Sequence, residues 1–214
     1  MNELNKIAVL FDFDGVVMDT EGQYTKFWDE QGSKYLHIES FGKTIKGQTL
    51  EQIYNKHFSG MDDIQMQITG DLNEYEENMS YEYLPGVVDF LKELHANGAG
   101  IALVTSSNLK KMANVYKIHP EMPELFDEIL TAERFTKSKP DPECFLLGMK
   151  LLGALPENSF VFEDSFHGLQ AGRSSGATVI GLATTNSREA IQGSCNWVID
   201  DFVNMTYDRL ILKS

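Results

Sequence analysis

The sequence is poor in cysteine, with 2 Cys among 214 residues. Cys144 and Cys195 have neither the spacing of a metal site nor the density of a disulfide framework. The chain must therefore fold around a hydrophobic core, and a hydrophobic content of 42% is sufficient to form one. Its length fits one large domain, or one domain with a small insert.

Long apolar runs are also missing. No stretch approaches the length of a transmembrane helix, and the N-terminus lacks the apolar run with a basic flank that is typical of a secretion signal. We therefore expect a cytoplasmic protein that has no membrane partner. The sequence has no internal repeat and no low-complexity tract.

Basic residues are few. There are 18 Lys and Arg against 32 Asp and Glu, which gives a formal net charge of −14. This charge argues against binding to nucleic acid or to an anionic membrane. It does not argue against a phosphate ligand, which local donors and a metal ion can hold.

The most informative motif is Phe11-Asp12-Phe13-Asp14-Gly15. It closes an apolar segment, residues 7–11, that is typical of a buried strand. Side chains alternate along a strand, so both carboxylates can lean to one side of its end, where open α/β sheets bind ligands. Two buried anions need a compensating cation or proton. One carboxylate can attack, its neighbour can move a proton and a hard metal can hold both; the alternative is a solvated acidic turn.

Three further motifs follow in order along the chain. Thr105-Ser106-Ser107 ends a second apolar run, Lys139-Pro140-Asp141-Pro142 precedes a helical segment, and Glu163-Asp164-Ser165 ends a third apolar run. With Asp12-Phe-Asp14-Gly15-Val-Val-Met-Asp19-Thr20, these motifs resemble the signature of the haloacid dehalogenase superfamily of phosphohydrolases. The resemblance spans nearly the whole chain. The most similar subfamily is the β-phosphoglucomutase-like group, which contains phosphatases and mutases.

The hydrophobic pattern divides the chain into two parts. Residues 18–81 carry apolar and aromatic stripes at helical spacing, which are typical of packed helices. The acidic segment 61–82 has no Lys or Arg, and we interpret it as a solvated helix face. From residue 87 onward helices alternate with strands, which are expected near residues 100–104, 128–130, 160–162, 177–181 and 197–199.

This alternation predicts a doubly wound parallel sheet. We therefore expect an α/β protein with a Rossmann-like catalytic core at residues 1–16 and 83–214. An inserted α-helical cap would occupy residues 17–82. Such a cap can act as a lid that excludes water from the site.

The resemblance implies roles for three residues. Asp12 would be the nucleophile that forms an aspartyl-phosphate, and Asp14 the general acid and base. True dehalogenases of the superfamily lack the second Asp and need no metal, so Asp14 indicates phosphate chemistry. Lys139 would balance the charge of Asp12 and the phosphoryl group; Lys137 is the alternative lysine, although the Lys-Pro pattern favours Lys139.

The resemblance also implies a Mg²⁺ site. Asp12 and Asp164 would bind the ion through their side chains and Asp14 through its backbone carbonyl. Glu163 would either bind directly or orient a water molecule. The alternative for Glu163-Asp164 is a helix N-cap, in which the aspartate satisfies free N–H groups.

Further residues are candidates for substrate binding. The Thr105 hydroxyl and the following N–H groups can hold a phosphoryl oxygen at a helix N-terminus, and Thr105 can also be the N-cap. Ser106, Ser107 and Asn108 are weaker candidates in the same loop. From the cap we expect contacts by Glu21, Tyr24, Gln48, Lys46 and Gly47.

We conclude from the sequence that the chain is a Mg²⁺-dependent phosphatase of a small phosphorylated metabolite, most simply a sugar phosphate, and a monomer. A phosphohexose mutase is the alternative, and a non-catalytic binding protein is a third interpretation. The family's sugar-phosphate mutases carry a His in the first cap helix and an Arg after the cap's glycine loop. Tyr24 and Leu50 occupy those positions here, and Leu is a poor replacement for an Arg clamp. Lys43 or Lys46 can supply the charge instead, but the substitutions favour hydrolysis.

Overall fold

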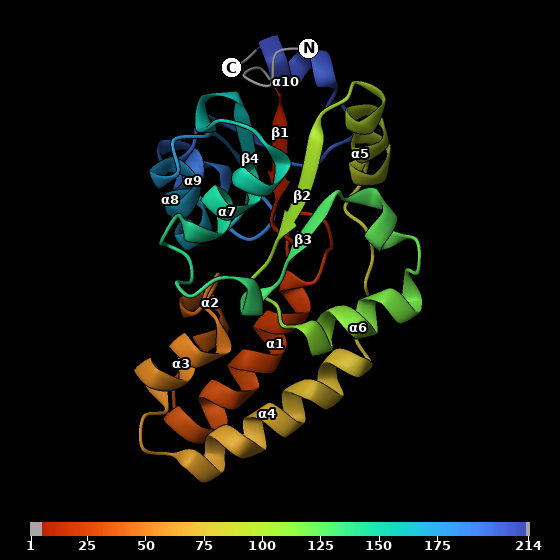
Figure 1. Cartoon of the computed structure of the whole chain (residues 1–214). Helices are drawn as coiled ribbons and strands as arrows, with labels where there is room; N and C mark the ends of the chain where they lie inside the picture. Colours follow the sequence, from red (N-terminus) through yellow and green to blue (C-terminus); the bar gives the residue numbers. More distant parts are fainter. Residues whose placement is uncertain (1–5, 213–214) are drawn as a thin grey trace.

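The computed structural model describes residues 6–212, and its centre is a six-stranded sheet in which every pair of neighbours is parallel (Figure 1). The strand order is β3-β2-β1-β4-β5-β6, the order of the Rossmann fold. The predicted doubly wound α/β core is therefore confirmed. The strands are β1 (Ala8–Phe11), β2 (Gly100–Val104), β3 (Glu128–Leu130), β4 (Ser159–Glu163), β5 (Thr178–Leu182) and β6 (Trp197–Ile199).

Helices follow the strands of the core in alternation. They are α5 (Val87–Ala96), α6 (Leu109–Ile118), α7 (Glu143–Leu152), α8 (Phe166–Ser174), α9 (Arg188–Ile191) and α10 (Tyr207–Leu212). Short 3₁₀ segments lie at Met122–Leu125, Ala132–Arg134, Pro156–Asn158 and Gln192–Ser194. Each parallel pair needs such a crossover, because parallel strands cannot be joined by a tight turn.

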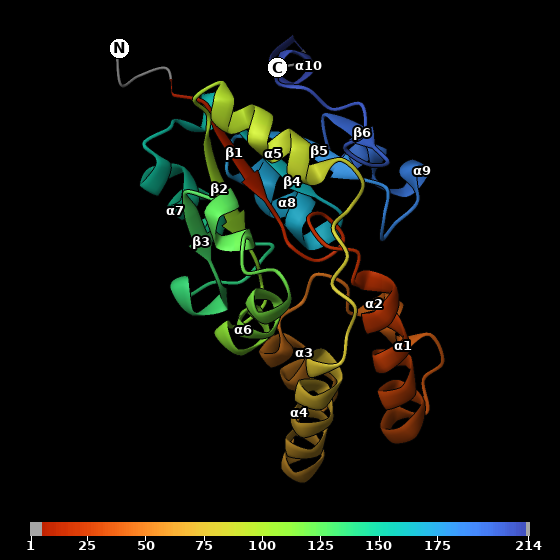
Figure 2. The same ribbon diagram turned by 90° about the vertical axis from the view of Figure 1, so that its right-hand side faces the viewer.

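Helices cover both faces of the sheet, as Figure 2 shows from the side. On β1, Val9 and Phe11 belong to the core that packs under α5 and α10, and Leu10 belongs to the core under α7 and α8. A strand covered on both faces has no polar face, which explains the continuous apolar runs of the sequence. Phe11 stacks on Phe162 of β4 with 4.8 Å between ring centroids, so aromatic packing fixes the central strand pair.

A second group of helices lies between β1 and the rest of the core in sequence, and beyond one end of the sheet in space (Figure 1). It contains α1 (Glu21–Gln31), a π-helical turn (Gly32–Leu36), α2 (Phe41–Thr44), α3 (Leu50–His57) and α4 (Asp62–Glu77). These helices enclose their own hydrophobic cluster, formed by Phe27, Trp28, Phe41, Ile45, Ile53, Phe58, Ile68 and Leu72. The expectation of an all-helical insert with packed aromatic stripes is confirmed.

Two segments join this helical cap to the core, and we call residues 17–19 and 82–84 the cap linkers. They run side by side: the Asp19 N–H donates to the Glu82 carbonyl (2.8 Å), and the Leu84 N–H donates to the Val17 carbonyl (2.9 Å). Met18 and Tyr83 also form an antiparallel bridge. Both connections are therefore tied to each other where they leave the core.

The structure corrects several details of the sequence interpretation. The strand expected at residues 177–181 is β5, which begins and ends one residue later. Helix α10 was not predicted, because its six residues bury only Leu210 and leave little periodic signal. The acidic segment 61–82 is not uniformly solvated, since Glu76 of α4 is 6% exposed.

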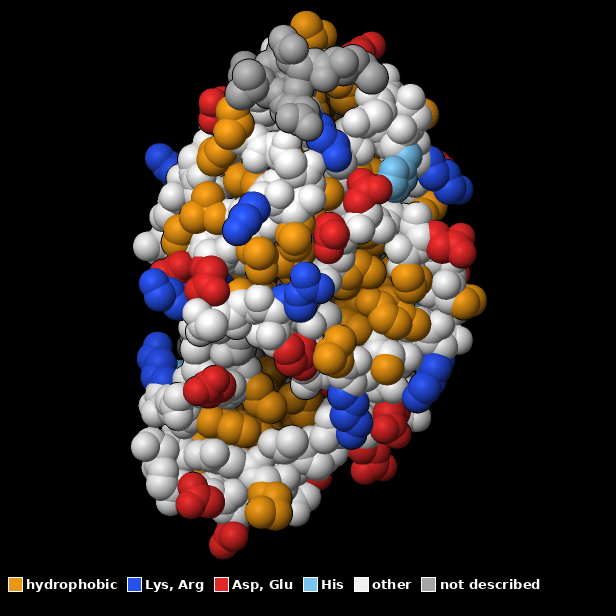
Figure 3. All heavy atoms as spheres, in the orientation of Figure 1, with side chains coloured by type: hydrophobic (Ala, Val, Ile, Leu, Met, Phe, Trp, Pro, Cys, Tyr) orange, Lys and Arg blue, Asp and Glu red, His pale blue; other side chains and the backbone are white. Residues whose placement is uncertain are grey.

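Charged side chains of both signs lie on the surface. On the face drawn in Figure 3, Lys and Arg side chains stand apart, with Asp and Glu between them. No helix within residues 6–212 combines the length and hydrophobicity needed to cross a bilayer.

Candidate active site

The carboxyl ends of β1 and β4 carry the acidic motifs. These two strands are neighbours, and the strand order reverses here, because β2 and β3 lie on one side of β1 and β4 to β6 on the other. A crevice at such a reversal is the usual ligand site of an open α/β sheet. The Asp12 N–H donates to the Phe162 carbonyl (3.0 Å), so the loop that follows β1 is still hydrogen-bonded to β4 where it begins.

Gly15 allows the loop after β1 to turn against Asp164. Its φ of +75° lies in the left-handed region, and a Cβ atom there would lie 2.1 Å from Asp164 Oδ2. The N–H groups of Val17 and Met18 return to the Phe13 carbonyl (2.9 and 3.0 Å) and close the turn. The glycine of the Asp-x-Asp-Gly motif is therefore needed for both backbone conformation and close approach.

Three carboxylates meet at the strand ends. Asp12, Glu163 and Asp164 are 9%, 0% and 1% exposed, and each offers an oxygen that lies within 4.8 Å of the others. Lys139 enters the cluster from the loop before α7. Its Nζ lies 2.7 Å from Asp12 Oδ1 and 2.6 Å from Glu163 Oε1. Lys137 is an exposed lysine near Asp141, so Lys139 is the lysine of the two that joins the site.

Burial determines the protonation of this cluster. It raises the pKa of Asp12 to about 7, although the Lys139 ammonium opposes the rise. It also raises the pKa of Asp164, to which Glu21 and Glu163 add repulsion. Burial alone would lower the pKa of Lys139, but Asp12 and Glu163 outweigh it and the pKa rises. Lys139 is therefore charged, and one positive charge faces three acids.

Both oxygens of Glu163 are already occupied by protein donors. Oε1 accepts from Lys139, and Oε2 accepts from the N–H groups of Asp164 (3.0 Å) and Ser165 (3.1 Å) and from the Ser165 hydroxyl (3.1 Å). Of the two roles expected for Glu163, this geometry favours an orienting role over direct metal binding. The residue holds Lys139 and the loop that carries Asp164.

The N-cap interpretation of Asp164 is wrong. Helix α8 is capped by Ser165, whose hydroxyl accepts from the Gly168 N–H (3.1 Å). The Asp164 side chain instead accepts from the Thr185 hydroxyl, and its carbonyl accepts from the Asn186 amide (3.0 Å). Two residues of the loop after β5 therefore orient Asp164 toward Asp12, a contribution that the sequence pattern did not indicate.

The donor set fits a hard divalent cation. Carboxylate oxygens are the ligands that Mg²⁺ prefers, and it is usually bound by one or two of them. Asp12 and Asp164 have the required oxygens, and when all three carboxyl groups are ionised the single charge of Lys139 leaves the cluster negative. A divalent ion would supply the missing positive charge.

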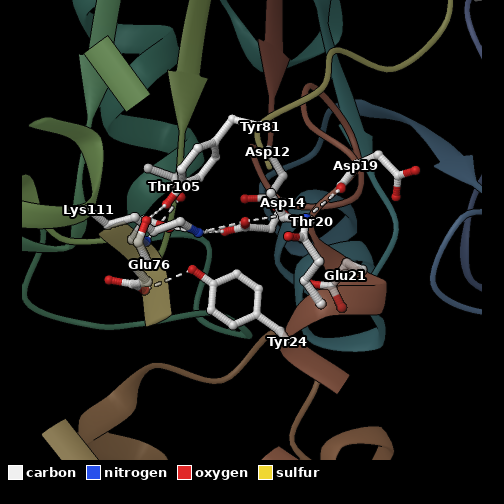
Figure 4. A network of polar contacts seen from close by, with 12 residues as sticks. Asp12, Asp14, Asp19, Thr20, Glu21, Tyr24, Glu76, Tyr81, Thr105 and Lys111 are labelled. Carbon is white, nitrogen blue, oxygen red and sulfur yellow. Dashed lines mark hydrogen bonds and ion pairs between the residues drawn. The ribbon is translucent and has the colours of Figure 1, made fainter. Parts of the chain in front are cut away.

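The Asp14 side chain is not part of this cluster. It points toward α6, where Lys111 Nζ lies 2.6 Å from each of its two oxygens (Figure 4). The Ser107 hydroxyl (3.0 Å) and the Thr20 hydroxyl also donate to it. Lys111 was missed from the sequence, although it lies four residues before Val115 on the buried face of α6.

The loop after β2 contributes unevenly to the site. Ser106, Ser107 and Asn108 line the cavity between core and cap, but Thr105 is not part of this lining. The Ser106 hydroxyl is buried and has no hydrogen-bond partner among residues 6–212, so it is free to receive a ligand. The N-cap expected at Thr105 is wrong: Asn108 caps α6 by accepting from the Lys111 N–H (2.9 Å), and Thr105 accepts from the Ser107 N–H (3.0 Å).

The cavity has a volume of about 150 Å³, and the cap closes it with both polar and apolar side chains. Glu21 is paired with Lys46, and the Tyr24 hydroxyl donates to Glu76 Oε1 (2.8 Å). Gln48 also lines the cavity. The expected cap residues therefore line the same cavity as Asp12 and Asp14. They are Glu21, Tyr24, Gln48, Lys46 and Gly47, and the apolar side chains of Trp28, Ile45, Leu50, Ile53 and Leu72 lie beside them.

At Gly47 the backbone of the cap lies close to the core. Its φ is +73°, and a Cβ atom there would lie 2.5 Å from the Ser165 hydroxyl oxygen. The neighbouring Lys46 carbonyl faces His167 Nδ1 at 3.3 Å. The cap is therefore seated directly on the loop that carries Asp164.

Comparison with known proteins gives a consistent picture. A family model described as haloacid dehalogenase-like hydrolase matches residues 9–182. The chain is 30% identical over 178 residues to hexitol phosphatase A of Escherichia coli, covering 81% of each protein. It is 25% identical over 230 residues to the bifunctional riboflavin kinase/FMN phosphatase of Arabidopsis thaliana, covering 97% of this chain but 57% of the relative's length.

A solved structure agrees over the same extent. The β-phosphoglucomutase of Clostridium difficile has a TM-score of 0.78 and 25% identity to this chain, and the match covers 97% of this chain and 96% of that one. The fold and the acidic site thus define a class, the Rossmann-like enzymes that hydrolyse phosphoric monoesters. Within that class, the chain belongs to the haloacid dehalogenase superfamily and is of the β-phosphoglucomutase-like type.

Proposed function

We propose that the protein is a Mg²⁺-dependent phosphatase of small phosphorylated metabolites, most simply sugar or sugar-alcohol phosphates, and that it acts through an aspartyl-phosphate on Asp12. The observation that carries the proposal is the contact of Asp12 with Lys139 beside Asp164. We also propose that residues 17–82 form the cap domain and residues 1–16 and 83–214 the catalytic domain.

Asp12 is suited to nucleophilic attack. Its Oδ1 accepts from Lys139, no donor among residues 6–212 is bound to Oδ2, and the residue lines the cavity. A phosphoryl group brought to this oxygen would bring further negative charge to a site that already holds three carboxylates. The Lys139 ammonium and a bound Mg²⁺, which would neutralise charge on the phosphoryl oxygens, offset that repulsion.

The remaining phosphoryl oxygens need hydrogen-bond donors. The Ser106 hydroxyl has no partner among the described residues, and Ser107 and Asn108 lie beside it on the cavity wall. Donors fixed in this way favour the transition state because they need no reorganisation when charge develops. We assign phosphoryl binding to this loop, with Ser106 in place of the Thr105 hydroxyl as the main side-chain donor.

Asp14 moves the proton in both halves of the reaction. In the first half, Asp12 forms a bond to phosphorus, the bond to the leaving oxygen breaks, and Asp14 gives its proton to that oxygen. In the second half, Asp14 takes a proton from water as the water attacks the aspartyl-phosphate. The product is inorganic phosphate, and Asp12 and Asp14 return to their starting states.

The cavity wall supports a polyhydroxylated substrate. Glu21, Tyr24, Gln48 and Glu76 bring hydrogen-bonding groups from the cap, as a sugar needs, while Trp28 offers an aromatic surface. The hydrolysis of hexitol phosphates by a relative at 30% identity supports the same substrate class.

A phosphohexose mutase is the second candidate, because the chain resembles a β-phosphoglucomutase along almost its full length. Leu50 and Tyr24 line the cavity at the two positions where we align the mutases' Arg and His. Lys46 is paired with Glu21 and Lys111 with Asp14, so neither lysine is free to clamp a second phosphate. This arrangement favours hydrolysis.

One experiment separates the two functions. The protein is incubated with Mg²⁺ and a panel of phosphomonoesters that includes β-glucose 1-phosphate with a trace of the 1,6-bisphosphate. We expect release of inorganic phosphate to exceed formation of glucose 6-phosphate by at least about tenfold, since water reaches the aspartyl-phosphate when no clamp retains a second sugar phosphate. Rapid isomerisation with little free phosphate would reverse the ranking, and absence of both products across the panel would reject the enzyme assignment.

Cap residues are expected to select the substrate. Replacing Tyr24 by Phe removes the hydroxyl bound to Glu76, and replacing Gln48 by Ala removes an amide from the wall. We expect each change to lower kcat/KM for the best sugar phosphate by roughly 10-fold, since one lost hydrogen bond costs about 1.5 kcal/mol. The value of kcat/KM for 4-nitrophenyl phosphate should fall by less than about twofold. Equal loss for both substrates would contradict selective contact.

A further inference from the structure

Lys111 is a charged residue of the cavity that the proposed reaction does not use. It lies in the first turn of α6, and its side chain is 3% exposed. Among residues 6–212 it forms no hydrogen bond or ion pair with the acidic cluster or with the Ser106 hydroxyl. Burying an ammonium is costly unless its hydrogen bonds are made, so the contacts that hold it in place have to be strong.

All of these contacts converge on Asp14. Lys111 Nζ lies 2.6 Å from Asp14 Oδ1, 2.6 Å from Oδ2 and 3.0 Å from the Ser107 hydroxyl. Ser107 in turn donates to Asp14 Oδ2 (3.0 Å). Lys111, Ser107 and Asp14 therefore contact one another mutually, and together with the Thr20 hydroxyl these contacts restrain the orientation of the Asp14 carboxylate.

The cap covers the other side of the same lysine. The Tyr24 ring of α1 lies over Nζ with 4.4 Å to its centroid, and the Phe13 ring of the core lies at 5.0 Å. The Tyr24 hydroxyl is held by Glu76 of α4. Figure 4 shows Tyr24, Lys111 and Asp14 converging on one point from the cap, α6 and the catalytic loop. The lysine is thus confined between two aromatic faces while the cap is seated.

We propose that Lys111 is a positioning residue that orients Asp14 for proton transfer to the leaving group, and that Tyr24 of the cap holds Lys111 in place. The inference rests on the proposed function, because it concerns the proton step of that reaction. General acid catalysis requires the acid within hydrogen-bond reach of the leaving oxygen, so a carboxyl group free to rotate transfers its proton less often.

A pair of esters with similar rings but different leaving groups tests the proposal. Benzyl phosphate releases an alkoxide and needs a proton as its bond breaks, whereas 4-nitrophenyl phosphate releases a stabilised phenolate and does not. The ratio kcat/KM reports only the steps up to transfer of the phosphoryl group to Asp12. Both esters are measured with Mg²⁺ for the unmodified protein, Lys111→Met and Lys110→Met, in which an exposed neighbouring lysine of α6 is changed.

We expect Lys111→Met to lower kcat/KM for benzyl phosphate by roughly 10- to 100-fold, part of the 10²–10⁴ that general acids contribute, and that for 4-nitrophenyl phosphate by less than about threefold. Lys110→Met should leave both unchanged. An equal fall for both esters would overturn the proposal, because a lysine that binds the phosphoryl group or merely supports the fold affects both alike.

Two further outcomes keep the test decisive. If circular dichroism shows that Lys111→Met does not fold, Lys111→Gln is measured in its place, because it removes the charge but keeps a polar side chain. It should lower kcat/KM for benzyl phosphate more than for 4-nitrophenyl phosphate. An equal fall for the two esters in this variant would also reject the role of Lys111. If the unmodified protein hydrolyses neither ester nor any phosphomonoester of the metabolite panel, the proposed function fails, and this result is distinct from an equal fall in the variant.

Discussion

Replacing Asp12 by Asn is expected to lower kcat for phosphate release by at least roughly 10⁴-fold, the scale on which removal of a nucleophile acts in enzymes. An amide oxygen cannot form the aspartyl-phosphate, and the change also removes the negative charge that faces Lys139. The side chain is nearly isosteric and Lys139 keeps Glu163 as a partner at 2.6 Å, so the fold should persist. Release of inorganic phosphate is measured for purified variants with matching circular dichroism spectra.

The matched control is Asp19→Asn, an exposed aspartate seven residues further along the same loop. It removes an equal charge from the sequence, but within the described part of the chain its side chain forms no hydrogen bond with the three clustered carboxylates. Activity should stay within about twofold of the unmodified protein, because isolated surface charges contribute little. A folded Asp12→Asn protein with near-normal turnover would refute the nucleophile assignment.

Removal of divalent metal is expected to lower activity by at least about 100-fold, because metal neutralisation of transition-state charge contributes several kcal/mol. The structural reason is the imbalance at the strand ends, where Lys139 faces Asp12, Glu163 and Asp164. Protein dialysed against EDTA is assayed before and after addition of MgCl₂. Activity that survives complete chelation would reject the metal site.

Binding of Mg²⁺ should also stabilise the fold in a pH-dependent manner. Burial raises the pKa of Asp12 from 3.8 to about 7, so without metal this carboxyl stabilises the fold below pH 3.8, and the stabilisation is lost as the pH rises toward 7. Asp164 has a raised pKa as well and acts in the same direction. The metal-free protein should therefore lose stability between about pH 4 and pH 7.

Thermal unfolding measures this effect without reference to activity. Saturating MgCl₂ should raise Tm by roughly 5–10 °C near neutral pH, where the carboxylates are ionised, and by clearly less near pH 5. Asp164→Asn should abolish most of the increase, since it removes one of the two proposed side-chain ligands. An increase that is independent of pH would contradict a site built on these buried carboxylates.

The sequence predicted those parts of the molecule that short-range patterns encode. Apolar runs identified the strands, and the proximity of Asp12 to Asp164 could be predicted because the ends of parallel strands meet at one edge of the sheet. Helix α10 was missed because a short helix with one buried residue shows no helical periodicity of apolar residues. Thr105 and Asp164 were considered as helix caps, but Asn108 and Ser165 cap the helices, since position relative to the first helical turn decides capping.

The parts that could not be predicted depend on tertiary contacts. Lys110 and Lys111 are adjacent in sequence, yet Lys110 is exposed to solvent. Lys111 is 3% exposed and contacts Asp14, because α6 faces the cap at that position. Glu76 belongs to an acidic segment that looked solvated, and it is buried because Tyr24 of α1 reaches it. No periodic pattern in the sequence indicates either contact, since each joins residues separated by many positions along the chain.

The paired cap linkers have a consequence for how the enzyme opens. Two chains that are hydrogen-bonded side by side at residues 17–19 and 82–84 resist being pulled apart or slid past one another, but they bend together easily. We therefore expect the cap to rotate as a rigid body about a single hinge axis at the linkers, and not to move independently on two flexible segments. Each closing movement would then return Gly47 to Ser165 and the Tyr24 ring to Lys111 in the same register, so that a substrate is enclosed by one reproducible geometry in every turnover.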